Sequence, residues 1–134
     1  MWPRVDGLRA LELGTPGEQR TWLNGLVLAG RKRATAGLLT EYTEEQEEFE
    51  HVGERLALLD DEGRRIATVE VTRVERTTFG EVPWEFAAAE DEGDEDIEEW
   101  RAGHRRDWAR QGIPVTDDTA VVLLWFRLVA DGDR

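Results

Sequence analysis

Three consecutive cations occupy positions 31–33 of a chain whose formal net charge is −13, and a threonine follows them at position 35. A lysine can hold a phosphate or polarise a carbonyl group, and a desolvated lysine can also be the base that turns a threonine hydroxyl into a nucleophile. Lys32 and Thr35 are therefore candidate catalytic residues. The competing interpretation is that the cations only complement the dipole of a helix that ends before them, by about 0.3–1 kcal/mol each.

The spacing of Lys32 and Thr35 requires a turn between them, because residues three apart lie on opposite faces of a regular strand. The flanking sequence predicts such a turn. A capping box beginning at Thr15 predicts the start of a helix, and Gly30 suits the left-handed residue that commonly ends one. Residues 34–39 are a predicted strand, so Lys32 is expected at a helix-to-strand corner.

The rest of the chain contains both strand-like and helix-like patterns. Alternating side chains predict a long strand over residues 65–78, and an almost wholly apolar run predicts a central strand over residues 119–129. The other predicted elements are a strand at 54–59, helices at 82–89 and 95–110, and an acidic loop at 42–52. This order predicts an α+β fold, a small mixed β-barrel with flanking helices.

The predicted helix 95–110 begins in a strongly acidic segment, with eight carboxylates in residues 90–99. These acids complement the dipole at a helix start, and they lack the twelve-residue calcium-loop pattern. The buried stripe of this helix contains Ile97, Trp100, His104 and Trp108. His104 is expected near the core with a hydrogen bond that satisfies its ring. Neither His51 nor His104 has a second ligand at the spacing of a metal site, so no metal is predicted.

The outer face of the same helix is basic, with Arg101, Arg105, Arg106 and Arg110. Ion pairs with nearby acids explain such a face. The alternative is that it binds phosphates beside residues 31–33. Trp84, which follows Pro83, is the tryptophan most expected to be exposed, where it would stack on an RNA base.

Composition limits the protein class. The 134 residues suit one domain. The absence of cysteine excludes disulfides and thiolate metal sites. No run approaches the roughly 20 apolar residues of a membrane span, and no signal sequence is evident, so a cytoplasmic protein without membrane partners is expected. The net acidity opposes long-range attraction to nucleic acid, although a local basic face can act within the screening length of about 8 Å.

The stretch "GRKRATA" resembles the signature of the ASCH family, which has a PUA-like β-barrel. That signature is glycine, any residue, lysine, any residue, a small residue and threonine, and it is matched by Gly30, Lys32, Ala34 and Thr35. The stretches "LLTEY", "VEVTRVERTTF", "FAAAEDEGDEDIEEWRAGHRRDW" and "WFRLV" are similar to the longer bacterial branch. The resemblance implies a single ASCH-like domain over residues 1–134, with a core of about 14–129.

The resemblance implies two activities. One small branch is similar to amidohydrolases that remove acyl groups from the exocyclic nitrogen of cytidine, using a lysine, a threonine three residues later and a downstream glutamate. Another branch resembles ribonucleases or RNA-binding modules. The lysine and threonine correspond to Lys32 and Thr35, and the glutamate corresponds to Glu92, with Glu90 as the alternative. The branch often has glycine between two such glutamates, where this chain has Asp91.

The expected function is therefore the binding of RNA or a nucleoside in a cleft lined by lysine, threonine and glutamate. In the enzymatic version the cleft hydrolyses N-acylated cytidine: Lys32 deprotonates Thr35 or orients a water, and Glu92 transfers the proton. Arg31 or Arg33 then stabilises the developing oxyanion. The alternative is a non-catalytic module for single-stranded RNA, or a ribonuclease. No cofactor is expected. The candidate substrate-binding or RNA-binding residues are Arg31, Arg33, Tyr42, Trp84 and Arg105.

Overall fold

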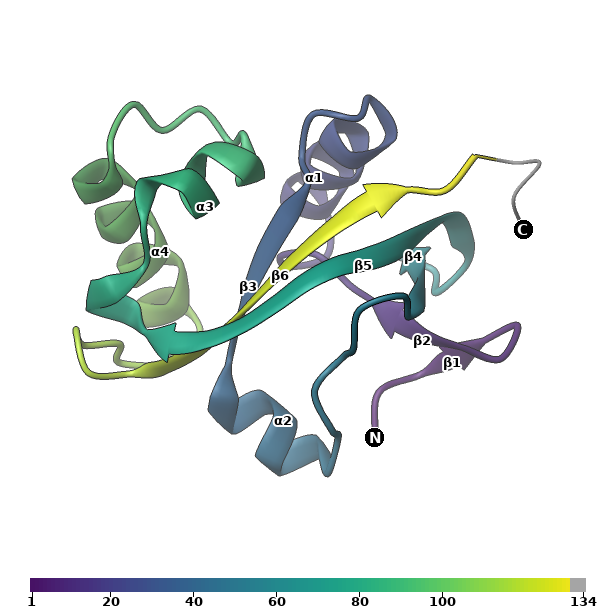
Figure 1. The fold of residues 1–134 in the computed structure, drawn as a ribbon, viewed down its shortest axis with the longest axis horizontal. Coiled ribbons are helices and arrows are strands. Elements are labelled where there is room, and N and C mark those ends of the chain that lie inside the picture. The colour runs from purple at the N-terminus through teal and green to yellow at the C-terminus, as the bar shows by residue number, and fades with distance from the viewer. Residues whose placement is uncertain (131–134) are drawn as a thin grey trace.

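The computed structural model describes residues 1–130, and the last four residues of the predicted 1–134 domain lie outside the described part. Over this range the chain forms a six-stranded mixed sheet and four α-helices (Figure 1). The strands are β1 (Arg4–Val5), β2 (Leu8–Leu11), β3 (Ala34–Leu38), β4 (Arg55–Leu59), β5 (Arg65–Thr78) and β6 (Ala120–Leu128). The helices are α1 (Glu18–Leu28), α2 (Leu39–Glu45), α3 (Trp84–Glu90) and α4 (Ile97–Arg110), and a 3₁₀ turn spans Phe79–Glu81.

The strands follow the order β1-β2-β4-β5-β6-β3. The β2–β4 pair is parallel and the other pairs are antiparallel. The predicted α+β class is confirmed. Within residues 1–130 hydrogen bonds do not close the sheet, so β1 and β3 are its edges and the predicted barrel is open between them.

The long β5–β6 pair forms the centre of the sheet. The predicted strand 65–78 is confirmed at both of its ends. A register shift between Val71 and Arg73 bends it, as β-bulges do. The apolar strand β6 lies between β5 and β3, as predicted for a central strand, and its residues 121–124 are buried.

The corner between α1 and β3 is built from backbone hydrogen bonds. Gly30 has a φ of 75°, and the N–H of Arg31 bonds to the Leu26 carbonyl at 2.9 Å, which is the pattern of a left-handed helix end. The predicted helix end is confirmed. The predicted cap is wrong, because Gly17 is the N-cap, and the Thr15 hydroxyl instead contacts the Gln19 side chain at 3.0 Å.

The acidic segment 42–52 does not form a loop throughout, because α2 extends to Glu45. Tyr42 belongs to this helix and its side chain is buried, with the ring packed edge-on against Trp2 and Phe49. One buried aromatic gives this short helix a packed side although its other side is acidic. The two N-terminal strands were not predicted either, because each is too short to show alternation.

Two groups of helices cover the sheet. Helices α3 and α4 lie together beside one end of the β5–β6 pair (Figure 1), where Trp100 is fully buried and stacks on Phe79 at 5.5 Å. Helix α1 packs Leu23 and Val27 on the apolar cluster around β4. No helix of the described chain has the length and apolar character to cross a membrane.

Candidate functional site

A cavity of about 240 Å³ contains the residues expected to do chemistry. Strand β3, the chain after α3, helix α4 and strand β2 all contribute to its wall. The predicted site residues that line it are Lys32, Thr35, Glu90, Glu92 and Tyr42. The turn between α1 and β3 therefore brings Lys32 and Thr35 to one cavity, because Lys32 precedes the strand and Thr35 lies within it.

Lys32 is the buried cation of the cavity, with a relative exposure of 2%. Its ammonium donates to the Ala34 carbonyl at 2.7 Å, to Glu90 at 3.0 Å and to Glu92 at 2.7 Å. These three acceptors match its three N–H bonds. Burial alone would lower the pKa of Lys32, but the charges and hydrogen bonds of Glu90 and Glu92 outweigh it and raise that pKa. Lys32 is therefore held as an ammonium.

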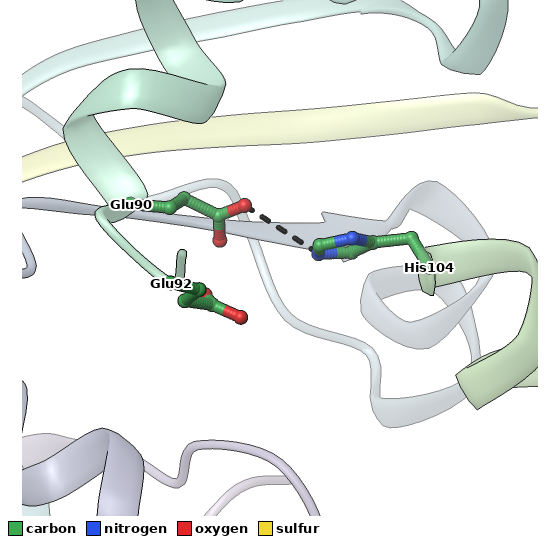
Figure 2. A group of neighbouring side chains, drawn as sticks. All are labelled: Glu90, Glu92 and His104. Carbon is green, nitrogen blue, oxygen red and sulfur yellow. Dashed lines mark ion pairs between the residues drawn. The ribbon is translucent and has the colours of Figure 1, made fainter. Parts of the chain in front are cut away.

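Glu90, the last residue of α3, is the most enclosed acid of this group. One carboxylate oxygen accepts the Trp100 indole N–H at 2.5 Å and lies 3.4 Å from His104, and the other accepts from Lys32. Burial opposes its ionisation, but Lys32 and the surrounding donors lower the pKa of Glu90 to about 2. Glu90 is therefore a fixed anion. Figure 2 shows its side chain directed at the His104 ring.

The pKa of Glu92 shifts in the opposite direction to that of Glu90, although the two residues are only two positions apart. Asp91, with a φ of 51°, ends α3 in the left-handed conformation and directs the chain so that Glu92 also reaches Lys32. Burial and the Glu90 charge raise the pKa of Glu92, although Lys32 acts against them. Its side chain retains 18% exposure. A carboxyl group with a raised pKa in a cavity is suited to transfer protons.

His104 lines the cavity, whereas the sequence prediction placed it only near the core. The predicted ring hydrogen bond exists, since Nδ1 lies 3.0 Å from the Trp100 carbonyl, and the ring stacks on Trp100 at 4.1 Å. The sequence prediction was incomplete in one respect, because it did not foresee that the ring also contacts Glu90 and lines the cavity. Burial lowers the pKa of His104, but the hydrogen bond and charge of Glu90 outweigh it and raise that pKa.

Glu90, Glu92 and His104 could together hold a metal ion, since one ligand atom from each lies within 4.8 Å of the others. The Lys32 ammonium, however, already lies within 3.0 Å of both carboxylates. A divalent ion would share these acids with a like charge, which disfavours it. Lys32 is thus the cation that this arrangement accommodates.

Thr35 lies on the wall of the cavity and is half-buried. Its side chain takes part in no hydrogen bond among residues 1–130, so its hydroxyl is available to a ligand. The other predicted binding residues lie outside the cavity lining. Arg31 and Arg33 are exposed, Arg31 pairing with Asp91 at 3.1 Å. Trp84 is 41% exposed, as expected, and Arg105 pairs with Asp117.

The wall of the cavity is unusually acidic, which the sequence did not indicate. Its carboxylates are Glu12, Glu41, Glu50, Glu90, Glu92 and Asp107. Among the described lining residues, Lys32 is the one lysine or arginine. These acids come from separate segments of the chain, so only the fold brings them together.

Comparisons with known proteins agree with this architecture. The family model described as "ASCH domain" matches residues 10–130. A crystal structure of an ASCH domain from Lactobacillus crispatus JV V101 is similar with a TM-score of 0.76 at 28% identity, covering 89% of this chain and 77% of that one. A protein from Enterococcus faecalis V583 gives a TM-score of 0.77 at 28% identity, covering 88% and 74%. No curated protein matches the chain.

Proposed function

The chain belongs to the ASCH domain family, and from this premise we propose that its cavity binds a nucleoside and removes an acyl group from the exocyclic nitrogen of N-acylated cytidine. The observation that carries the proposal is the buried Lys32–Glu92 contact of 2.7 Å, in the same cavity as the unpaired Thr35 hydroxyl. This is the combination of lysine, threonine and glutamate that the family resemblance associates with amide hydrolysis.

The size and charge of the cavity favour a nucleoside over an RNA chain. At about 240 Å³ it lies just below the roughly 300–1,000 Å³ usual for drug-sized ligands, so it suits one small molecule. A phosphate group would enter a wall with several carboxylates, where Lys32 is already shared between two of them. The negative charges of these carboxylates repel a phosphate group. A neutral nucleoside meets no such penalty.

The electrostatics of the cavity support Glu92 as the group that transfers the proton. Lys32 cannot accept a proton from Thr35 because it is held as an ammonium, so its role is to position Glu92 and to offset negative charge. The Thr35 hydroxyl attacks the acyl carbon while the Glu92 carboxylate takes its proton. Glu92 then gives that proton to the exocyclic nitrogen, so that cytidine leaves and an acyl–threonine ester remains. Water hydrolyses the ester, with Glu92 again transferring the proton, and releases the carboxylic acid.

Release of cytidine from N-acetylcytidine, followed by chromatography, tests this proposal. We expect Glu92→Gln to reduce kcat by roughly 10²–10⁴-fold, the usual contribution of a general acid–base group. Glu95→Gln is the matched control, because Glu95 is an exposed acid of the same segment that does not line the cavity. Mass spectrometry of the Thr35 peptide should detect the acyl–threonine ester in slow variants. No turnover by the native protein would disprove the hydrolase.

RNA binding without chemistry is the second candidate, favoured by a specific surface feature. Arg33 and Trp84 are exposed, and Arg33 forms no ion pair among residues 1–130. An exposed cation and an aromatic ring are the groups that hold single-stranded RNA. A binding isotherm that weakens with rising salt and with Arg33→Ala would support this candidate. No binding of a short single-stranded RNA at low salt would remove it.

A further inference from the structure

We propose that Glu50 and Tyr42 form a second binding subsite in the same cavity, which hydrogen-bonds the ribose hydroxyls of the ligand. The inference rests on the proposed function, because it takes the ligand to be a nucleoside. It adds a recognition role for Glu50, and it gives the ligand an orientation.

The two side chains form a rigid buried pair. Tyr42 is 5% exposed and Glu50 is 7% exposed, and the Tyr42 hydroxyl donates to Glu50 at 2.7 Å. Gln46 ends α2 in the left-handed conformation with a φ of 55°, so the chain turns back and brings Glu50 under the helix. Edge-on packing by Trp2 and Phe49 fixes the Tyr42 ring. Both members of the pair line the cavity.

Glu50 retains unused capacity to accept hydrogen bonds. A carboxylate offers about four acceptor positions, whereas the donors to Glu50 within the described chain are the Tyr42 hydroxyl and its own backbone N–H. No lysine or arginine among residues 1–130 forms an ion pair with it. Arg9, whose charge acts on Glu50, is itself paired with Glu54 at 3.1 Å. A buried acceptor of this kind gains from a ligand that brings hydroxyl donors.

Strand β3 sets the distance between the two parts of the cavity. It connects the corner that holds Lys32 to the start of α2 (Figure 1). Thr35 and Gly37 lie on one face of this strand, roughly 7 Å apart. A Cβ at Gly37 would lie 3.7 Å from the Tyr42 ring, so Tyr42 marks the far end. Leu124 pairs with Thr35 and packs in the Tyr42 cluster, which makes it the apolar floor between the two ends.

The chemistry of the proposed substrate matches this layout. In N-acylated cytidine the acyl group and the ribose are attached at opposite positions of the six-membered ring. An acyl group placed at Thr35 therefore directs the ribose away from Lys32, along β3 towards Gly37 and Tyr42. Hydrogen bonds from ribose hydroxyls to a carboxylate are an established recognition mode in nucleotide-binding folds.

Isothermal titration with cytidine and with cytosine, the same base without ribose, tests the subsite independently of turnover. We expect the native protein to bind cytidine more tightly than cytosine. Glu50→Gln, which keeps the shape of the side chain but removes its charge, should reduce that preference roughly tenfold. Glu50→Met, which removes the acceptors, should abolish it. Glu48→Gln is the matched control, because Glu48 is an exposed acid outside the cavity.

The outcomes separate the two proposals. A preference for cytidine that falls in Glu50→Gln, disappears in Glu50→Met and is kept in the Glu48 variant supports the subsite. Equal binding of cytidine and cytosine, or a preference that survives Glu50→Met, overturns the subsite alone. Failure of the native protein to bind either compound overturns the nucleoside function and the subsite with it. Thermal unfolding of each variant checks that the fold is kept.

Discussion

The two ends of the cavity bury the same type of side chain in different electrostatic surroundings. At one end Glu90 and Glu92 share the Lys32 ammonium, and His104 stands beside them. At the other end Glu50 accepts a hydrogen bond from the neutral Tyr42 hydroxyl, and Glu41 accepts one from the Leu38 backbone N–H at 3.2 Å. At the first end a lysine is ion-paired with the glutamates. At the second end no lysine or arginine of residues 1–130 forms an ion pair with either glutamate.

This difference teaches that burial alone does not determine what a carboxylate does. Lys32 and the neighbouring donors lower the pKa of Glu90, whereas burial raises the pKa of Glu50 and of Glu41 by more than their hydrogen bonds, and the Arg9 charge near Glu50, lower it. A compensated anion is fixed in place and can position other groups. An uncompensated carboxyl group gains from a donor that arrives with the ligand.

Removing Lys32 should produce the largest effect, because it breaks the compensation at the first end. Lys32→Met leaves the buried Glu90 without its ammonium partner, and we expect the free energy of unfolding to fall by about 3–5 kcal/mol. Urea denaturation measures the change. Arg33→Met, a neighbouring exposed cation, should change it by less than about 0.5 kcal/mol. A Lys32 variant as stable as the Arg33 variant would show that the cluster carries no structural role.

Glu90 and Glu50 should contribute to the pH dependence of stability with opposite signs. Glu90, with its pKa lowered from 4.5 to about 2, contributes stability that is present above about pH 4.5 and is lost as the pH falls. Glu50, with its pKa raised, contributes stability that is present below about pH 4.5 and is lost as the pH rises through its folded-state pKa.

The matching substitutions test these signs. Glu90→Gln should flatten the loss of stability between about pH 5 and about pH 2, by up to roughly 3 kcal/mol. Glu50→Gln should flatten the decline in stability above about pH 4.5, because it removes the group whose pKa is raised by burial. Denaturation across this pH range, with Glu48→Gln as control, measures both. Profiles of the same sign would contradict the comparison.

The smallest effect on turnover and stability is expected from a substitution that lies outside both ends of the cavity. Arg31 and Asp91 form an ion pair whose side chains are 60% and 40% exposed, and such pairs contribute about 0–1 kcal/mol. Arg31→Ala should therefore leave turnover of N-acetylcytidine unchanged and stability within about 0.5 kcal/mol of the native protein. A tenfold loss of turnover would restore Arg31 to the binding role predicted from the sequence.

The sequence predicted those parts of the site that depend on local patterns. Gly30 indicated the end of α1, and this placed Lys32 at a corner from which it shares a cavity with Thr35. The alternation of residues 65–78 predicted β5 at both ends. These features depend on neighbouring residues, which a single sequence displays.

Features that depend on contacts between distant segments were not predictable. Glu50 reaches the cavity only because α2 ends at Gln46 and the chain folds back, and the acidic composition of that segment had predicted a loop. His104 contacts Glu90 across α3 and α4, and its position in an apolar stripe had indicated only burial. The open edges of the sheet depend on the pairing of β1 and β2, which are too short to be predicted by alternation.

The left-handed backbone at Asp91 explains a departure of this chain from the pattern of its family. Two alternate residues, Glu90 and Glu92, converge on one ammonium because the residue between them has a φ of 51°. Glycine adopts this conformation most easily, and aspartate is among the few other residues that tolerate it. Glycine and aspartate at position 91 are thus two ways to meet one backbone requirement, whereas a β-branched residue there would separate the two glutamates.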